Sequence, residues 1–214
     1  MPDPLVLGFD TSAAHCAAVL LRGDSVLAER HEEMGKGQAE RLMPMLEEVL
    51  AEGGADWAAL DRIGVGVGPG NFTGIRLSVS AARGLALALK IPAVGVSVLD
   101  ALALGSKGPL VACLDARRGK VFLQVFGQAD SAPVMADLDA LPDGLQGLPC
   151  IGSGAEAVAA ITGGPVYPAR YAPASAIARI AAVRPADNID RPAPLYLRQA
   201  DAAPPRDAPP AILP

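Results

Sequence analysis

The stretch Leu5–Leu21, LVLGFDTSAAHCAAVLL, contains the pattern that decides the fold. An apolar run ends at Asp10, small residues follow, and a second apolar run begins at His15. Short apolar runs separated by turn residues predict buried strands. The stretch therefore predicts two strands joined by a tight turn, and Val26–His31 predicts a third strand after it.

A weaker copy of this pattern begins after residue 108. Leu110–Leu114 is an apolar run that ends at Asp115, Arg117-Arg118-Gly119 supplies a turn, and Val121–Phe126 alternates as a second strand. We interpret the chain as an internal duplication whose second copy is eroded. The predicted organisation is an N-terminal lobe over residues 1–107, a reduced C-terminal lobe over 108–199 and a flexible, proline-rich tail over 200–214.

Helices and further strands are expected between and after the two hairpins. Apolar residues at helical spacing predict the first helices, and apolar runs beside glycine or proline predict the strands. The predicted helices are Gln38–Glu52, Gly74–Lys90, Val98–Gly105, Ala155–Ile161 and Ala174–Arg184, and the predicted strands are Ile63–Val67, Ala93–Val96, Val134-Met135 and Pro149–Ile151.

Composition narrows the class of protein. The chain has 18 Lys and Arg against 23 Asp and Glu, a net charge of −5, and 4% aromatic residues. Such a chain is a poor binder of nucleic acid by itself, because it repels phosphates and offers few stacking platforms. The N-terminus does not resemble a signal peptide, no run of about 20 apolar residues occurs, and the three cysteines lack metal or disulfide spacing. We therefore expect a cytoplasmic protein without a membrane span.

The residues at the strand ends suggest a nucleotide site. A carboxylate and small hydroxyl residues in a hairpin turn can hold a phosphate and a metal, although the same residues often only cap their own turn. Gly152-Ser153-Gly154 is likewise either a contact for a nucleotide or an ordinary strand-to-helix turn, and the ordinary turn is favoured. The candidate residues of a vestigial nucleotide site are Asp10, Thr11, Ser12, Asp115, Gly152 and Gly154.

The loop between Ile63–Val67 and the second long helix is rich in glycine. It lacks the Gly-Lys-Ser/Thr ending of a phosphate-binding loop, and Asn71 stands where a dinucleotide fingerprint needs its third glycine. A structural role is favoured, with Thr73 as the N-cap of the helix. The residues assigned to this structural loop are Gly68, Gly70, Thr73, Gly74 and Arg76.

The two long helices also suggest a surface for a partner, although core packing is the default for their apolar faces. The candidate interface residues are Leu42, Met45, Leu46, Val49, Ser78, Ala81, Ala82 and Leu85. No catalytic residues are predicted, because the two histidines, His15 and His31, form no metal-binding pair and no nucleophile elbow occurs. No metal site is expected.

Several segments together resemble a known family. Leu5–Leu21 resembles the phosphate hairpin of the sugar kinase, Hsp70 and actin superfamily. The segments GPGNFTGIR (68–76), GLA (84–86), GVSVL (95–99), LDARRGKV (114–121) and PLYLR (194–198) resemble the bacterial TsaB family, in the right order and at the right distances. Asn71 stands where the family commonly has serine, and Gln38 stands near the place where relatives often have histidine.

The resemblance implies an α/β, duplicated actin-like (ribonuclease H-like) fold with a reduced C-terminal lobe. It further implies a non-catalytic scaffold that binds the catalytic TsaD subunit and the ATPase TsaE. That complex transfers a threonylcarbamoyl group to N6 of adenosine 37 in tRNAs that read ANN codons. The chain would bind tRNA only through the complex, form a homodimer when alone and need no cofactor of its own, with ATP or ADP at the level of the complex.

Two other functions compete with the scaffold. An actin-like ATPase or kinase would use Asp10 and the Gly152 turn, although the C-terminal lobe is short for enclosing a nucleotide. A metallopeptidase corresponds to older names of relatives, but it would need the histidine pair that is missing.

Overall fold

The computed structural model describes residues 3–128, 131–185 and 189–197, and the predicted tail at 200–214 lies outside them. Two five-stranded sheets of mixed direction dominate the fold. The strands are β1 (Leu5–Asp10), β2 (His15–Arg22), β3 (Ser25–Glu33), β4 (Arg62–Gly66), β5 (Ala93–Val96), β6 (Leu110–Arg117), β7 (Lys120–Phe126), β8 (Val134–Asp137), β9 (Cys150–Ile151) and β10 (Val166–Tyr167). The helices are α1 (Gln38–Glu52), α2 (Phe72–Leu89), α3 (Val98–Ala103), α4 (Ala155–Thr162) and α5 (Pro173–Val183), with single 3₁₀ turns at Trp57–Ala59 and Leu138–Ala140.

The two sheets share one topology. The first has the order β3-β2-β1-β4-β5, and the second, read from the matching edge, has the order β8-β7-β6-β9-β10. In each sheet the opening strand pairs antiparallel with the second strand and parallel with the fourth. The predicted duplicated actin-like fold is therefore confirmed. The second copy is smaller, because α4 has 8 residues where α2 has 18, and only a 3₁₀ turn lies between β8 and β9, where the first copy has α1.

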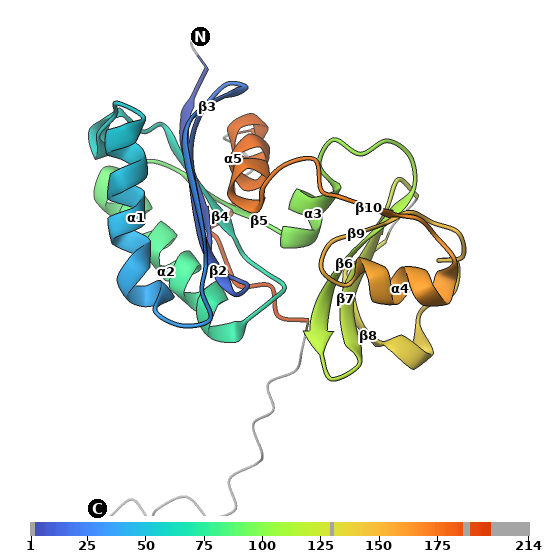
Figure 1. Ribbon diagram of the computed structural model, residues 1–214. Helices are drawn as coiled ribbons and strands as arrows, with labels where there is room; N and C mark the ends of the chain where they lie inside the picture. Colours follow the sequence, from blue (N-terminus) through green and yellow to red (C-terminus); the bar gives the residue numbers. More distant parts are fainter. Residues whose placement is uncertain (1–2, 129–130, 186–188, 198–214) are drawn as a thin grey trace, which may run out of the picture.

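Helices cover both faces of the first sheet (Figure 1). Side chains alternate across a strand, so Leu5, Leu7 and Phe9 of β1 join the core beneath α1 and α2. Val6 points to the opposite face and packs in a second core with α5, which includes Ile177. One strand thus contributes to two cores, which explains why the whole of β1 is buried.

The last helix of each copy, α3 in the first and α5 in the second, packs against the sheet of the other copy. α3 follows β5 in sequence but contacts β6 and β7, whereas α5 follows β10 but packs on β1, β2 and β4. Glycine permits this close approach, because a Cβ on Gly8 would lie 2.7 Å from Cβ of Ala178. Arg62 Nη1 also donates to the carbonyl oxygen of Ala181 at 2.9 Å. The last helix of the predicted C-terminal lobe (108–199) therefore packs on the first sheet, where it forms the second core.

Helix α2 combines an apolar sequence with little burial. Its mean hydropathy is 1.2, and 28% of its 18 residues are buried. By length and composition it is the one helix among the described residues that is long and apolar enough to cross a membrane. Core helices of soluble proteins share this composition, and α2 packs Ile75, Val79 and Ala82 into the first core.

Candidate functional site

The turn between β1 and β2 contains the first predicted acid. Asp10 is fully buried, and its Oδ2 accepts hydrogen bonds from Ser12 Oγ and His15 Nε2, each at 2.8 Å. Burial lowers the pKa of His15, but the hydrogen bond and charge of Asp10, together with the charge of Glu33, outweigh it and raise that pKa. Ser12 and His15 bind the same carboxylate oxygen, so they form a buried anchor and not a nucleophile with its base.

The second oxygen of Asp10 faces the glycine loop. Asp10 Oδ1 is buried without a hydrogen-bond partner among the described residues. A Cβ on Gly66 would overlap this oxygen. The end of β4 therefore approaches the carboxylate closely, and residue 66 must be glycine.

The glycine loop fills the space beside the turn. Thr11 Oγ1 donates to the carbonyl oxygen of Gly74 at 2.7 Å, and the backbone N–H of Asn71 donates to the carbonyl oxygen of Ser12 at 2.6 Å. A Cβ on Gly70 or Gly74 would overlap the carbonyl oxygens of Ser12 and Thr11. The groups that a phosphate would need thus bind the protein itself.

The N-cap of α2 differs from the prediction. Asn71 holds that position, and its Oδ1 accepts from the amides of Thr73 and Gly74 at 2.9 and 3.1 Å. The prediction of Thr73 as the cap is wrong by two residues. Thr73 lies exposed in the first turn of α2. Asn and Thr are both good caps, so composition alone did not separate the two positions.

The second copy repeats the docking of a glycine turn on its opening strand. The Gly154 amide donates to the carbonyl oxygen of Cys113 at 3.1 Å, and Ser153 Oγ accepts from the Asp115 amide at 3.1 Å. Gly152 has φ +109°, and a Cβ there would overlap the Cys113 carbonyl oxygen. Asp115 is exposed and accepts the Arg117 amide within its own turn at 2.7 Å.

The predicted partner surface on α1 and α2 is largely wrong. Ala81 and Leu85 are half-buried and also pack against the first core. The periodicity selected the inward face of each helix, because apolar residues at helical spacing mark the face that packs in the core. The residues that point outward on α2 include Ser80, Gly84 and Leu87. Six of the eight predicted residues are buried in the chain itself: Leu42, Met45, Leu46, Val49, Ser78 and Ala82.

A cluster at the start of α2 was not predicted. Phe72 and Tyr196 lie with their ring centroids 5.0 Å apart, and the Arg76 guanidinium stacks 3.8 Å from the Phe72 ring centroid. Tyr196 comes from the segment 189–197, which runs beside the first sheet, where the Leu195 amide donates to the carbonyl oxygen of Val67. Helical spacing could have paired Phe72 with Arg76, but nothing in the sequence places Tyr196 beside them.

Neither a metal site nor a reactive cysteine is found among the described residues. No group of three or more His, Cys, Asp or Glu side chains there could hold a metal ion. Burial raises the pKa of the Cys113 thiol to about 12, and Cys16 and Cys150 are buried free thiols as well. These thiols are protonated and unreactive at neutral pH.

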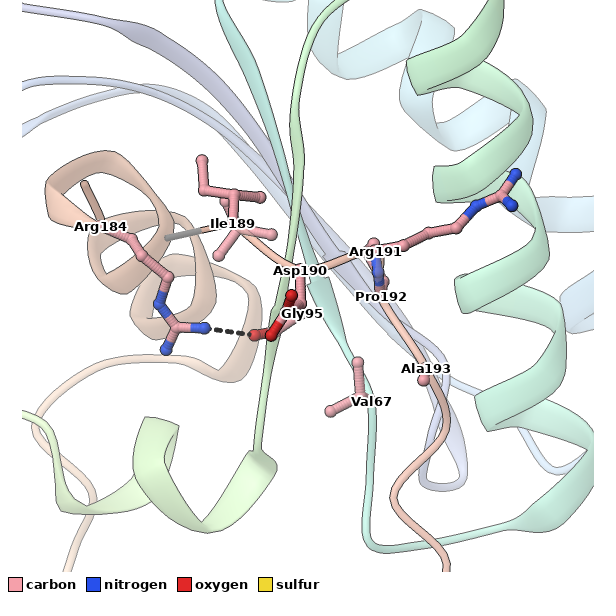
Figure 2. A pocket seen from close by; sticks show the side chains of 9 residues that line it. Val67, Gly95, Arg184, Ile189, Asp190, Arg191, Pro192 and Ala193 are labelled. Atoms are coloured by element: carbon pink, nitrogen blue, oxygen red, sulfur yellow. Dashed lines mark hydrogen bonds between the residues drawn. The ribbon is translucent and has the colours of Figure 1, made fainter. Parts of the chain in front are cut away.

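A pocket of about 470 Å³ lies at the outer edge of β5 (Figure 2). Arg184 closes one side, where its Nη1 donates to the carbonyl oxygen of Gly95 at 2.9 Å. None of the residues predicted for a nucleotide lines it. The lining residues are Val67, Val94, Gly95, Arg184 and 189–193.

Comparisons with known proteins give a consistent result. Residues 28–145 match the model of the family described as TsaD: tRNA N6-adenosine threonylcarbamoyltransferase. An uncharacterized protein of Mycobacterium tuberculosis is 37% identical over 209 residues, which cover 93% of this chain and 94% of that protein.

Two further proteins narrow the assignment. The tRNA threonylcarbamoyladenosine biosynthesis protein TsaB of Escherichia coli is 32% identical over 122 residues, 55% of this chain and 52% of that protein. The fold matches, with a TM-score of 0.71 and 24% identity, an uncharacterized protein from Pseudomonas aeruginosa with similarity to peptidase YEAZ, over 91% of this chain and 100% of that one. With the duplicated fold and the docked glycine loop, these matches show that the chain belongs to the TsaB family, within the wider family that the TsaD model describes.

Proposed function

We propose that this chain takes part in the biosynthesis of threonylcarbamoyladenosine in tRNA as a non-catalytic scaffold that binds a TsaD-type catalytic subunit. The match to the TsaD model supports a relationship between the two subunits, and the name of the E. coli relative supports the pathway. In this proposal TsaE and the tRNA join through the complex, which acts in the cytoplasm.

The observation that carries the proposal is the exposed outer face of α2. Ser80, Gly84 and Leu87 point away from the core, and a Cβ on Gly84 would meet nothing within 4 Å. Leu87 is 76% exposed. Small side chains beside an exposed leucine permit close approach of another helix. A partner that covers this face would bury apolar surface that the chain leaves in solvent.

A charge on this face tests the scaffold role. The variant Gly84→Arg places a long cation on α2, whereas Ala157→Arg places the same side chain on an exposed position of α4. Size-exclusion chromatography with light scattering measures the mass of each variant mixed with the TsaD-type subunit of the same organism. We expect a heterodimer with wild type and Ala157→Arg, and separate subunits with Gly84→Arg. Separate subunits with the wild type would contradict the proposal.

The same face would serve a homodimer when the chain is alone. Gly84→Arg then also converts the free chain to a monomer, and addition of the TsaD-type subunit replaces the homodimer of the wild type. A homodimer that persists in Gly84→Arg would place self-association on another surface.

No nucleotide of its own is part of the proposal. The hydroxyls of Thr11 and Ser12 and the first amides of α2 already have protein partners. Isothermal titration calorimetry with Mg-ATP is expected to show no binding to the isolated chain. Binding at millimolar nucleotide would favour the ATPase or kinase alternative.

A further inference from the structure

Three exposed side chains form a compact cluster where α2 begins. Phe72 is 47% exposed and Tyr196 is 43% exposed, and their rings are in contact. Arg76 joins them, since its Nε donates to the Tyr196 hydroxyl at 2.8 Å while its guanidinium covers the Phe72 ring. The cluster links the first turn of α2 to the segment 189–197.

The composition of the cluster is unusual for this chain. The sequence has four Phe, three Tyr and one Trp among 214 residues, and two of these eight rings lie together on the surface. Tyr, Phe and Arg are enriched in protein interfaces, and Tyr and Arg dominate the positions that carry most binding energy. A stacked arginine is also already ordered, so it loses little side-chain freedom when a partner binds.

The charge of Arg76 indicates what the partner presents. No carboxylate pairs with it among the described residues, because its one described hydrogen bond goes to Tyr196 through Nε. Within residues 3–128, 131–185 and 189–197 the two Nη groups of Arg76 bind no other side chain, and they form a planar pair of donors that fits a carboxylate. The aromatic rings beside it fit apolar side chains.

We propose that Phe72, Arg76 and Tyr196 anchor the partner subunit through a carboxylate flanked by apolar side chains. This inference rests on the proposed function, because it names the anchor of the same interface. Arg76, Ser80 and Gly84 follow one another at intervals of four along α2, and all three are exposed. A single partner surface can therefore cover the cluster and the outer face together.

Nucleic acid is the less favoured occupant of the cluster. The cluster contains a single cationic side chain, Arg76, and the chain has a net charge of −5. Phosphate recognition normally uses several Lys and Arg side chains. Binding of a single carboxylate needs only the one guanidinium.

Calorimetric affinities for the TsaD-type subunit test the anchor. We expect Phe72→Ala, Tyr196→Ala and Arg76→Glu each to weaken binding by about tenfold or more, as hot-spot truncations do. The matched control is Tyr167→Ala, which removes an exposed ring from β10; its affinity is expected to stay within about twofold of wild type. Thermal melts check that each variant is folded.

A milder variant separates the carboxylate contact from packing. Arg76→Lys keeps the charge but loses the planar pair of donors, so we expect binding about threefold to tenfold weaker. Affinity equal to that of wild type would overturn the carboxylate contact. The wild-type affinity should also fall with added salt more steeply than that of Arg76→Gln, and equal salt dependence would overturn the contact as well.

The outcomes distinguish the two proposals. If the wild type does not bind the TsaD-type subunit, the proposed function fails and the anchor fails with it. If Gly84→Arg abolishes binding while the three cluster variants bind like wild type, only the anchor is overturned. Cluster variants that keep the partner but lose tRNA from the assembled complex would instead assign the cluster to nucleic acid.

Discussion

Asp10 and Asp115 end equivalent strands in the two copies of the fold, but their surroundings are opposite. Asp10 is fully buried, and Ser12 and His15 bind one of its oxygens. Asp115 is exposed and binds only the backbone of its own turn through its side chain. In the first copy, the glycine loop before α2 covers the turn that contains Asp10. In the second copy, only three residues lie between β9 and the short helix α4. The comparison shows that one ancestral position has become a core anchor in one lobe and a surface residue in the other.

The largest effect is expected at the glycine loop. Gly74→Ala places a methyl group on the Thr11 carbonyl oxygen, and backbone cannot move aside as a side chain can. We expect a loss of about 3 kcal/mol or more in the free energy of unfolding. Gly84→Ala on the same helix meets nothing within 4 Å and should stabilise the protein by up to about 1 kcal/mol. Urea denaturation of both variants makes the measurement, and equal effects would contradict the tight docking of the loop.

The two acids should differ when each is removed. Asp10→Ala leaves Ser12 and His15 without their buried acceptor, so we expect the free energy of unfolding to fall by about 2–3 kcal/mol. Asp115→Ala removes one exposed hydrogen bond and should cost less than about 1 kcal/mol. Denaturation midpoints with unchanged slopes report these differences. A large loss from Asp115→Ala would mean that the second turn is as tightly constrained as the first.

The cap of α2 is expected to have a moderate effect. Asn71→Ala removes the acceptor for the amides of Thr73 and Gly74 and should cost about 1 kcal/mol. Asn71→Ser keeps a capping oxygen and should lie within a few tenths of a kcal/mol of wild type. The N-cap residue of α4, Gly154, makes no side-chain cap, so the second copy has no corresponding hydrogen bond to remove. Thermal unfolding of the two Asn71 variants tests this assignment.

The smallest effect concerns pH. The pKa of His15 in the folded protein lies above its ordinary value of 6.5, so its charged pairing with Asp10 stabilises the fold fully below about pH 6.5. That stabilisation is lost as the pH rises through the raised pKa. His15→Gln retains a donor without titrating, so the advantage of wild type over this variant should shrink with rising pH. Melting temperatures across neutral pH measure it, with Glu33 and His31 as the other titratable neighbours; a constant difference would contradict the charged pair.

Much of the fold was predictable because its signals are local. The run ending at Asp10 and its copy ending at Asp115 predicted both sheets, and the first helix matches Gln38–Glu52 residue for residue. β10, formed by Val166 and Tyr167, was missed because two residues beside prolines give no periodicity. The position of α5 was missed for another reason, since sequence order does not say which sheet a closing helix covers.

The candidate site was less predictable than the fold. An apolar face on α1 marks the core as readily as an interface, which is why Leu46 and Val49 were misassigned. Gly66 and Gly74 were assigned to a loop, but which groups they approach depends on contacts far along the chain. The contact between Tyr196 and Arg76 spans 120 residues and leaves no periodic trace.

During synthesis, every strand of the first sheet leaves the ribosome before β6, while the helix that covers Val6 and Val19 leaves only after β10. A chain that stops short of α5 therefore has all ten strands and still exposes one apolar face of its first sheet. Exposed apolar surface of this kind is what chaperones and proteases act on. Because α5 crosses back to the first sheet, the second core closes only after the strands of both sheets have been synthesised.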